Sequence, residues 1–235
     1  MNWQPIPKPA ELAETRLLDA ILDGRFPVNS PLPGERELAA QLGVTRPTLR
    51  EALQRLARDG WVEIQHGKPT RVRDYWREGS LAVLATLAQS PAHPSAEFVT
   101  HLLEVRALLA PAYARQALER APAEIAALLA GTASLADDPV AYARADWELH
   151  TGLARRAANP VFPLLLNSFA GLALLMGERY FARPECRRHS RAYYTALRRL
   201  AEAPTPKAPA RAEALTRRVM QASLALWRGR PPSGE

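Results

Sequence analysis

The segment 32–73 constrains the fold most strongly, because it combines two short helices, a tight turn and a two-stranded hairpin. Its first helix is predicted over Glu35–Leu42, where apolar residues repeat on one face. Gly43 follows, at the position where a left-handed residue ends a helix at low cost. Residues 62–65 and 70–73 are predicted to pair as strands around a turn at residues 66–69. This order of elements is that of a winged helix-turn-helix, whose shape fits DNA grooves.

The second helix of this segment has a well-marked start. Thr45 is its predicted N-cap, with a hydroxyl that can accept a hydrogen bond from the N–H of Thr48. Pro47 is tolerated in the first turn, because the N–H groups there have no partner within the helix. Arg46 and Arg50, four residues apart, project together from one face. The apolar residues of another face recur at helical spacing and are Leu49, Leu53 and Leu56.

The basic and hydroxyl-bearing residues of this segment suit contacts with DNA. Arginine offers a planar fork that binds O6 and N7 of guanine in the major groove. Hydroxyl groups at a helix N-terminus can donate to phosphates, and a glycine at the wing tip permits close approach to the backbone or minor groove. A solvated basic helix beside an ordinary hairpin is the alternative, but the combined order of turn, cap, arginines and wing favours DNA. The residues that carry this prediction are Thr45, Arg46, Thr48, Arg50, His66, Gly67 and Lys68.

Overall charge supports this interpretation less than the motif does. The chain has 235 residues and a formal net charge of +7, with room for one small and one larger domain. Residues 1–73 hold 11 Lys and Arg against 9 Asp and Glu, and residues 74–182 hold 8 against 11. Residues 183–235 hold 12 against 4, so most of the excess positive charge lies outside the predicted DNA-binding segment.

The remaining composition indicates a protein of a reducing compartment. The single cysteine, Cys186, cannot form a disulfide within the chain and is assigned no role. The N-terminus lacks a basic stretch followed by an apolar run, so no signal peptide is expected. The most apolar segment, Pro160–Met176, is interrupted by Asn167, Ser168 and two prolines and is predicted to be a buried core helix rather than a membrane span. We therefore expect a soluble, cytoplasmic protein.

The sequence predicts a mainly α fold, because no β signal follows residue 73. A winged helix-turn-helix domain is expected over residues 1–73, a charged linker over 74–80, and an all-α bundle of six or seven helices over 81–235. Proline, glycine or Asn-Pro separates the predicted helices. Outside the segment described above, they cover residues 11–22, 81–88, 96–118, 122–135, 140–157, 160–181, 184–202 and 211–228.

These motifs resemble those of the GntR superfamily of transcription regulators and, in the helical part, its FadR subgroup. The stretches RPTLREALQRLARDGW and IQHGKPT carry the first resemblance. Glu104-Val-Arg106, Asn159-Pro160, LNSFAGLALLMGERYFARPE and Trp227 carry the second. The resemblance covers nearly the whole chain, is densest over residues 32–73 and thins after about residue 183. It implies a homodimer that binds a short palindromic operator.

The resemblance also implies how the DNA would be contacted. It places Arg36, Arg46, Thr48 and Arg50 at the major groove and phosphates, and His66, Gly67 and Lys68 at the minor groove. Pro47 departs from the family pattern, which usually has a threonine there. One phosphate contact from a hydroxyl would therefore be lost, while base reading by the arginines would be kept.

For the helical domain the resemblance implies a long-chain acyl-CoA effector, which shifts the wings apart and releases DNA. Such regulators repress fatty acid degradation and activate unsaturated fatty acid synthesis. Met220 and Ala222 stand where the family has a glycine and a glutamate, and Ala173 replaces a tyrosine. Core packing is the alternative role for the matching aromatic residues, and basic side chains of the tail could attract coenzyme A phosphates. The matching effector residues are Tyr180, Ser223 and Trp227.

Neither a metal site nor an enzyme is predicted. Asp146 and His150 share one helix face, but a metal site needs more than two ligands. Where metal-binding relatives of the subgroup supply histidines, this chain has Ser190 and Ser223, and His189 lies about 100° around the helix. No phosphate loop, nucleophile elbow or supported Cys–His arrangement is present, and no cofactor is expected. The alternatives are a regulator of the same fold that senses another ligand such as an organic acid, and a helical acyl-CoA-binding protein that has lost operator binding.

Overall fold

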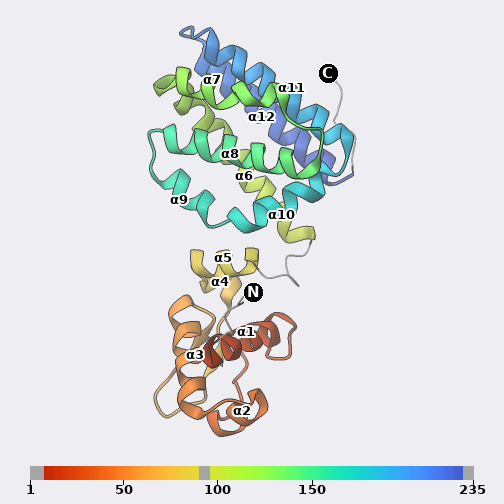
Figure 1. Ribbon diagram of the computed structural model, residues 1–235. Helices are drawn as coiled ribbons and strands as arrows, with labels where there is room; N and C mark the ends of the chain where they lie inside the picture. The colour runs from red at the N-terminus through yellow and green to blue at the C-terminus, as the bar shows by residue number, and fades with distance from the viewer. Residues whose placement is uncertain (1–7, 90–95, 230–235) are drawn as a thin grey trace. The chain divides into compact units, whose positions relative to one another are not determined.

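The computed structural model describes residues 8–89 and 96–229. The chain divides into two compact units, of which the first ends at Leu87 and the second begins at Ala88 (Figure 1). Helices dominate both units, and two short strands in the first unit form the only sheet within the described residues. The predicted mainly α fold is therefore confirmed.

The first unit contains the predicted helix-turn-helix and its wing. Val62 pairs with Val72 and Glu63 with Arg71 in an antiparallel hairpin, which is shorter than the sequence predicted. The elements of this unit (Figure 1) are α1 Pro9–Leu22, α2 Glu35–Leu42, α3 Arg46–Asp59, β1 Val62–Glu63, β2 Arg71–Val72, α4 Tyr75–Glu78 and most of α5 Leu81–Gln89, whose last two residues lie beyond Leu87.

The helix ends in this unit follow from the residues that cap them. Gly43 ends α2 with a φ of 68°, and Gly60 ends α3 with a φ of 98°, both in the left-handed region. The Thr45 Oγ1 accepts a hydrogen bond from the N–H of Thr48 at 3.3 Å, which confirms the predicted N-cap. Helix α1 packs across α3, and the buried apolar side chains of the unit include Leu17, Leu38, Leu49, Leu53, Leu56 and Trp61.

The boundary between the units differs from the sequence prediction. The expected linker over 74–80 contains the helix α4, and the first compact unit continues to Leu87. At the start of α4 the buried ring of Tyr75 packs on Trp61, with 4.9 Å between the ring centroids. Tyr75 therefore joins α4 to the core of the first unit. The functional limits of the two domains stay a prediction.

The second unit is all α-helical in its described residues, with seven α-helices and one 3-10 turn, as predicted. Helix α6 packs along α12 and against α8, while α11 packs against α7 and α12 (Figure 1). The elements are α6 Ala96–Arg120, α7 Pro122–Ala130, η1 Gly131–Ser134, α8 Pro139–Arg156, α9 Val161–Asn167, α10 Ala170–Phe181, α11 Pro184–Glu202 and α12 Ala208–Trp227.

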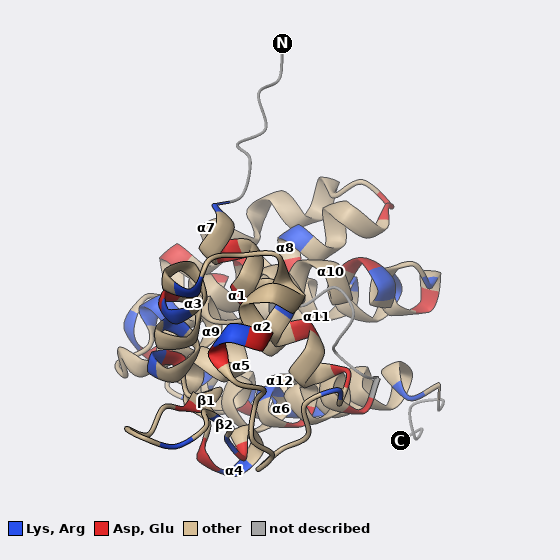
Figure 2. Ribbon diagram, turned by 90° about the horizontal axis from the view of Figure 1, so that it is seen from below, with Lys and Arg blue, Asp and Glu red and all other residues tan. Residues whose placement is uncertain are grey.

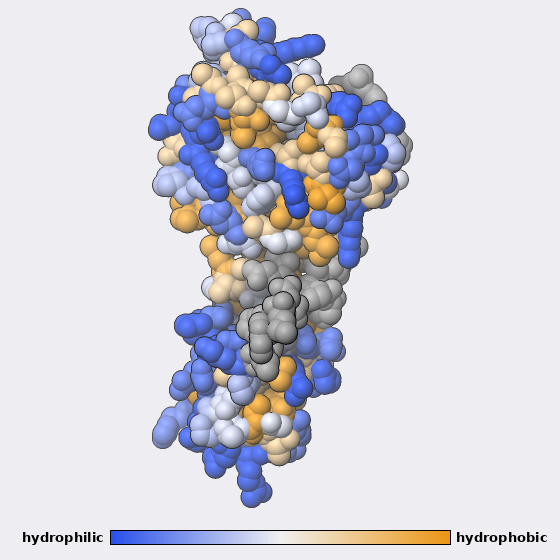
Figure 3. Space-filling view, viewed as in Figure 1, coloured by the Kyte–Doolittle hydropathy of each residue, from blue (hydrophilic) through white to orange (hydrophobic). Residues whose placement is uncertain are grey.

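Buried aromatic rings fill much of the core of the second unit. Tyr113 on α6, Tyr142 on α8, and Tyr193 and Tyr194 on α11 are each at most 2% exposed. Hydrophilic residues cover much of the visible surface of this unit, with apolar residues between them (Figure 3). The most exposed of its large apolar side chains is Leu108, at 73%.

The most apolar segment does not form the single buried helix that the sequence predicted. Two helices, α9 and α10, bend by 68° at Ser168 and Phe169, and α9 has no buried residue. The Ser168 hydroxyl donates to the carbonyl oxygen of Leu164 at 3.3 Å, and Phe169 packs on a small apolar cluster with Leu172. In the described residues no single helix is long and apolar enough to cross a membrane, although this bent pair together would pass by length and composition.

A close contact between α8 and α10 generates a stability prediction. A Cβ added at Gly177 would lie 2.9 Å from the Cβ and 3.3 Å from the Cα of Ala143, neither of which can swing away. We expect Gly177→Ala to lower the free energy of unfolding by about 1 kcal/mol or more, because the cost of overpacking exceeds the gain in helix propensity. Gly171→Ala in the same helix is the matched control, since nothing lies within 4 Å of its added Cβ. Urea denaturation that finds Gly177→Ala as stable as Gly171→Ala would contradict this contact.

Candidate functional site

A groove in the first unit lies between the helix-turn-helix and the wing. Its walls come from α2, α3 and residues 64–70, and its volume is about 770 Å³. Six of the eight residues predicted to contact DNA line it, from three separate segments of the chain. They are Arg36, Arg46, Arg50, His66, Gly67 and Lys68.

The two predicted threonines lie beside this groove, at the start of α3. The hydroxyls of Thr45 and Thr48 are 2.8 Å apart and hydrogen bonded to each other. Thr45 also accepts from the Thr48 N–H, so its oxygen serves the helix cap first. One hydroxyl hydrogen of the pair is left for an outside acceptor, which is compatible with one phosphate contact.

An acidic residue that sequence reasoning missed pairs with the two arginines predicted to read bases. The Glu35 Oε2 lies 2.8 Å from the Nε of Arg50 and 3.6 Å from an Nη of Arg46. Basic and acidic positions both occur on α2 and α3 (Figure 2). Both guanidinium groups stay more than half exposed, and surface pairs of this kind contribute only about 0–1 kcal/mol. Glu35 therefore orients the two arginines, and breaking these ion pairs so that the arginines can contact DNA would cost little free energy.

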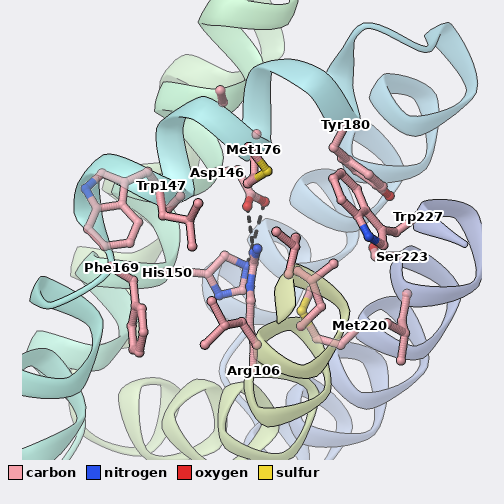
Figure 4. Close-up of a pocket in the computed structure, with 18 of the residues that line it drawn as sticks. Arg106, Asp146, Trp147, His150, Phe169, Met176, Tyr180, Met220, Ser223 and Trp227 are labelled. Atoms are coloured by element: carbon pink, nitrogen blue, oxygen red, sulfur yellow. Dashed lines mark hydrogen bonds and ion pairs between the residues drawn. The ribbon is translucent and has the colours of Figure 1, made fainter. Parts of the chain in front are cut away.

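A cavity in the second unit brings the three predicted effector residues together. Tyr180 on α10 and Ser223 and Trp227 on α12 lie along one wall, and the volume is about 170 Å³ (Figure 4). Trp147 and Phe169, which sequence reasoning did not select, contribute aromatic surface elsewhere in the cavity. Most of the other lining side chains are aliphatic, from α6, α8, α9, α10 and α12. The cavity therefore favours an apolar ligand.

Tyr180 and Trp227, the aromatic residues predicted to contact the effector, both pack against core residues and line the cavity. The ring of Tyr180 packs edge-on against Phe181, with centroids 4.9 Å apart, while the Tyr180 hydroxyl is buried without a hydrogen-bond partner. Trp227 packs against the apolar cluster around Val99 and also lines the cavity. Met220, one of the departures from the family pattern, is part of the same wall, and Ala173 lines the cavity too.

The centre of the cavity is polar. An Nη of Arg106 on α6 donates to the Asp146 Oδ2 on α8 at 2.6 Å, and the Tyr194 hydroxyl donates to the other carboxylate oxygen at 3.1 Å. Burial acts to raise the pKa of Asp146, but the positive charge of Arg106 and the hydrogen bonds from Arg106 and Tyr194 act together to hold that pKa below its ordinary range. The same carboxylate raises the pKa of Arg106 against the opposing effect of burial. Asp146 and Arg106 therefore form a charged pair inside the unit.

His150 lies beside this pair and stays neutral. It is only 2% exposed, and its Nδ1 is 2.6 Å from the Tyr113 hydroxyl. Burial, followed by the positive charge of Arg106, lowers the pKa of His150 to about 3. Its Nε2 lies 3.7 Å from the nearer Asp146 oxygen and has no hydrogen-bond partner. The Nε2 edge of this imidazole therefore has no polar partner in the fold.

The arrangement gives no sign of a metal centre in the part of the chain that the structure describes. No group of three or more histidine, cysteine or acidic side chains could hold a metal ion there. His189, the nearest sequence candidate for a further ligand, hydrogen bonds the carbonyl oxygen of Val219 at 3.3 Å instead. The single cysteine, Cys186, is buried and packs in the helical core.

Comparison with known proteins assigns both units to described families. Residues 9–72 match the model of bacterial regulatory proteins of the gntR family, and residues 73–230 match that of the FadR C-terminal domain. A fatty acid metabolism regulator protein of Erwinia tasmaniensis is 41% identical over 80% of this chain and 79% of its own. The protein of the same name from Salmonella paratyphi B is 42% identical over 83% of this chain and 81% of its own.

A solved structure supports the fold. Lar, which controls the expression of the Listeria monocytogenes agr system, is 18% identical and aligns over 95% of this chain and 96% of its own with a TM-score of 0.58. The groove beside α3 and the family matches together define a DNA-binding transcription regulator rather than an enzyme. Within that class, the chain belongs to the GntR family, in the group with a FadR-type C-terminal domain.

The neutral state of His150 generates a prediction about pH. Its pKa is lowered from the ordinary 6.5 to about 3, so between these pH values the imidazole is protonated in the unfolded chain but not in the folded chain. The free energy of unfolding should therefore fall as pH drops from 7.5 to 5.0, and fall less in His150→Gln. His66→Gln, at an exposed histidine of the wing, is the control, and its free energy of unfolding should change with pH as that of the wild type does. The free energy of unfolding would be measured by denaturation at several pH values in this range. An equal decrease for wild type and His150→Gln would contradict a buried neutral imidazole.

The groove generates a prediction about base recognition. Arg46→Ala or Arg50→Ala should each weaken binding to a palindromic operator by about 1–3 kcal/mol and blur base preference at one position of each half-site. Arg58→Ala is the control, because this side chain is 74% exposed in the last turn of α3 and pairs with Asp59. Fluorescence anisotropy with the operator and its single-base variants would measure both effects. Full affinity and unchanged base preference in both variants would show that these arginines do not read the groove.

Proposed function

We propose that this chain is an acyl-CoA-responsive regulator of fatty acid metabolism that binds a palindromic operator as a homodimer. Long-chain acyl-CoA in the helical unit would release the DNA, so that fatty acid degradation is repressed without ligand and unsaturated fatty acid synthesis is activated. The observation that carries the proposal is the convergence of Tyr180, Ser223 and Trp227 on one mainly apolar cavity. The relatives named as fatty acid metabolism regulator proteins support it.

The DNA-binding half of the proposal is supported by the groove of the first unit. Two arginines of α3 and the wing residues His66 and Lys68 line the same depression, although about 20 residues separate them in sequence. A second copy related by two-fold symmetry would present the same groove to the other half-site of a palindrome. The proposed contacts of Thr45 and Thr48 with phosphates would come from the start of the same helix.

The effector half is supported by the chemistry of the cavity and its surroundings. Aliphatic and aromatic side chains suit an acyl chain, since each buried methylene contributes about 0.8 kcal/mol. Helices α11 and α12 carry exposed basic residues, including Arg188, Arg211 and Arg218, that suit the phosphates of coenzyme A. Met220 fills part of the wall where the family has a smaller residue. The acyl chain of the ligand would therefore take a different path there from its path in other family members.

The size of the cavity favours a second candidate, a regulator of the same fold with a smaller ligand such as an organic acid. Ligand sites are usually about 300–1,000 Å³, whereas this cavity has about 170 Å³. A long acyl chain would therefore have to widen it, and the bend between α9 and α10 is a suitable place because α9 has no buried residue. The charged Asp146 argues against a second anion at the centre, since a carboxylate there would meet a like charge.

A ligand titration separates these candidates. We expect hexadecanoyl-CoA to bind, to quench or shift the fluorescence of Trp227, and to release the operator, because its chain buries the most methylene groups in the cavity. Butanoyl-CoA and free coenzyme A should show none of these three effects at the same concentration, since affinity should rise steeply with the length of the acyl chain. Calorimetry and operator anisotropy on the full chain would measure binding and release.

The controls make the outcome decisive. Trp76→Phe, at an exposed tryptophan of the first unit, should keep the fluorescence response, whereas Trp227→Phe should reduce it to the part that comes from Trp147, which also lines the cavity. No heat, no fluorescence change and no loss of operator binding at excess hexadecanoyl-CoA would contradict the proposed effector. Release by a short organic acid instead would select the second candidate.

A further inference from the structure

We propose that the polar centre of the cavity, formed by Arg106 and His150, binds a hydroxyl group carried by the acyl chain of the ligand. The inference rests on the proposed function and names the class of acyl-CoA that this chain prefers. It starts from atoms that the fold buries and leaves unused. The Arg106 Nε and the His150 Nε2 are both buried without a hydrogen-bond partner.

Unpaired buried polar atoms are costly, and here they belong to residues that line a ligand cavity. Leaving such an atom without a partner lowers stability, which is why nearly all of them are paired in folded proteins. Arg106 and His150 both line the cavity, and His150 is only 2% exposed. Their other polar contacts are already in place, to Asp146 and Tyr113 respectively. The orphan atoms are therefore available to a ligand without breaking the network that holds these side chains.

The chemistry of the two atoms selects the oxygen that would pair with them. The Arg106 Nε–H is always a donor, so the ligand must supply an acceptor. His150 is neutral, and its Nε2 either donates or accepts, depending on which ring nitrogen carries the hydrogen. A hydroxyl accepts from Arg106 and can meet either form of His150, whereas a plain methylene pairs with neither. A carboxylate is disfavoured, because Asp146 lies 3.7 Å from the His150 Nε2.

The position of the polar centre places this oxygen along the chain rather than at its end. In Figure 4, Arg106, Asp146 and His150 lie between Trp147 and Phe169 on one side and the group of Tyr180, Ser223 and Trp227 on the other. Aromatic surface therefore flanks the polar atoms in both directions. An acyl chain that enters along one wall would pass the centre and continue into the other apolar part, so that one interior carbon faces Arg106 and His150.

The experiment compares hexadecanoyl-CoA with its 3-, 6-, 9-, 12- and 16-hydroxy derivatives by calorimetry on the full-length protein. We expect one interior hydroxyl position to bind at least as tightly as the unsubstituted chain. At positions that face neither this centre nor the unpaired Tyr180 hydroxyl, the buried hydroxyl of the ligand lacks a partner, and the dissociation constant should rise about 5- to 150-fold. S-hexadecyl-CoA, which lacks the thioester carbonyl, should bind within a few-fold of hexadecanoyl-CoA, because the centre is not reserved for that oxygen.

Two variants and a control assign the preference to named residues. Arg106→Met and His150→Phe should each abolish the positional preference, so that the favoured hydroxyl derivative becomes as weak as the others, while hexadecanoyl-CoA still binds. Arg179→Met is the matched control, since this exposed arginine of α10 does not line the cavity. Should a variant fail to fold, the wild-type series with its position dependence decides the question by itself.

The outcomes separate this inference from the proposed function. Binding of hexadecanoyl-CoA together with weaker binding of every hydroxy derivative would overturn the inference and leave the proposed effector standing. A large loss of affinity for S-hexadecyl-CoA in the same series would show that the centre binds the thioester carbonyl, which also overturns it. Absence of binding by any of these acyl-CoA compounds would overturn both.

Discussion

The ion pair between Arg106 and Asp146 is the contact on which the second unit depends. It joins α6 to α8 at 2.6 Å, and the Tyr194 hydroxyl adds α11 to the same carboxylate. Charges inside a protein are favourable only when they are well paired, and removal of one partner leaves an uncompensated charge that costs about 3–5 kcal/mol. Burial keeps His150 neutral by lowering its pKa, and the positive charge of Arg106 adds to this effect, whereas Asp146 acts in the opposite direction. A polar centre thus survives within an otherwise apolar cavity because its charges satisfy each other.

The local chemistry of the helix-turn-helix made the first unit predictable. Glycines at helix ends, the Thr45 cap and the leucine spacing of α3 act within a few residues, so a sequence pattern captures them. The wing was predicted for the same reason, although only two residue pairs form its ladder. The ion pairs of Glu35 with Arg46 and Arg50 were not predicted, because up to 15 residues separate the partners and only the fold brings them together.

The helical unit shows where sequence reasoning stops. The break between α9 and α10 includes Phe169, which packs on an apolar cluster that contains Val99 of α6, 70 positions away. The polar centre likewise joins residues 40 positions apart, and Arg106 was recognised only as part of a family motif. The resemblance did select Tyr180, Ser223 and Trp227, which meet at one cavity wall. Their role in binding an effector stays a proposal. Sequence periodicity and composition alone would not have predicted it.

The central claim is that ligand in the cavity and DNA at the groove oppose each other, and linkage tests it most directly. Coupling between two sites is reciprocal, so an acyl-CoA that weakens operator binding must itself bind more weakly when the operator is present, by the same factor. The measurement is the dissociation constant of hexadecanoyl-CoA for the full-length protein with and without saturating operator. The account predicts a rise of about 5- to 150-fold, equal to the loss of operator affinity caused by the ligand. Equal constants in the two titrations would show that the two sites are uncoupled and would contradict it.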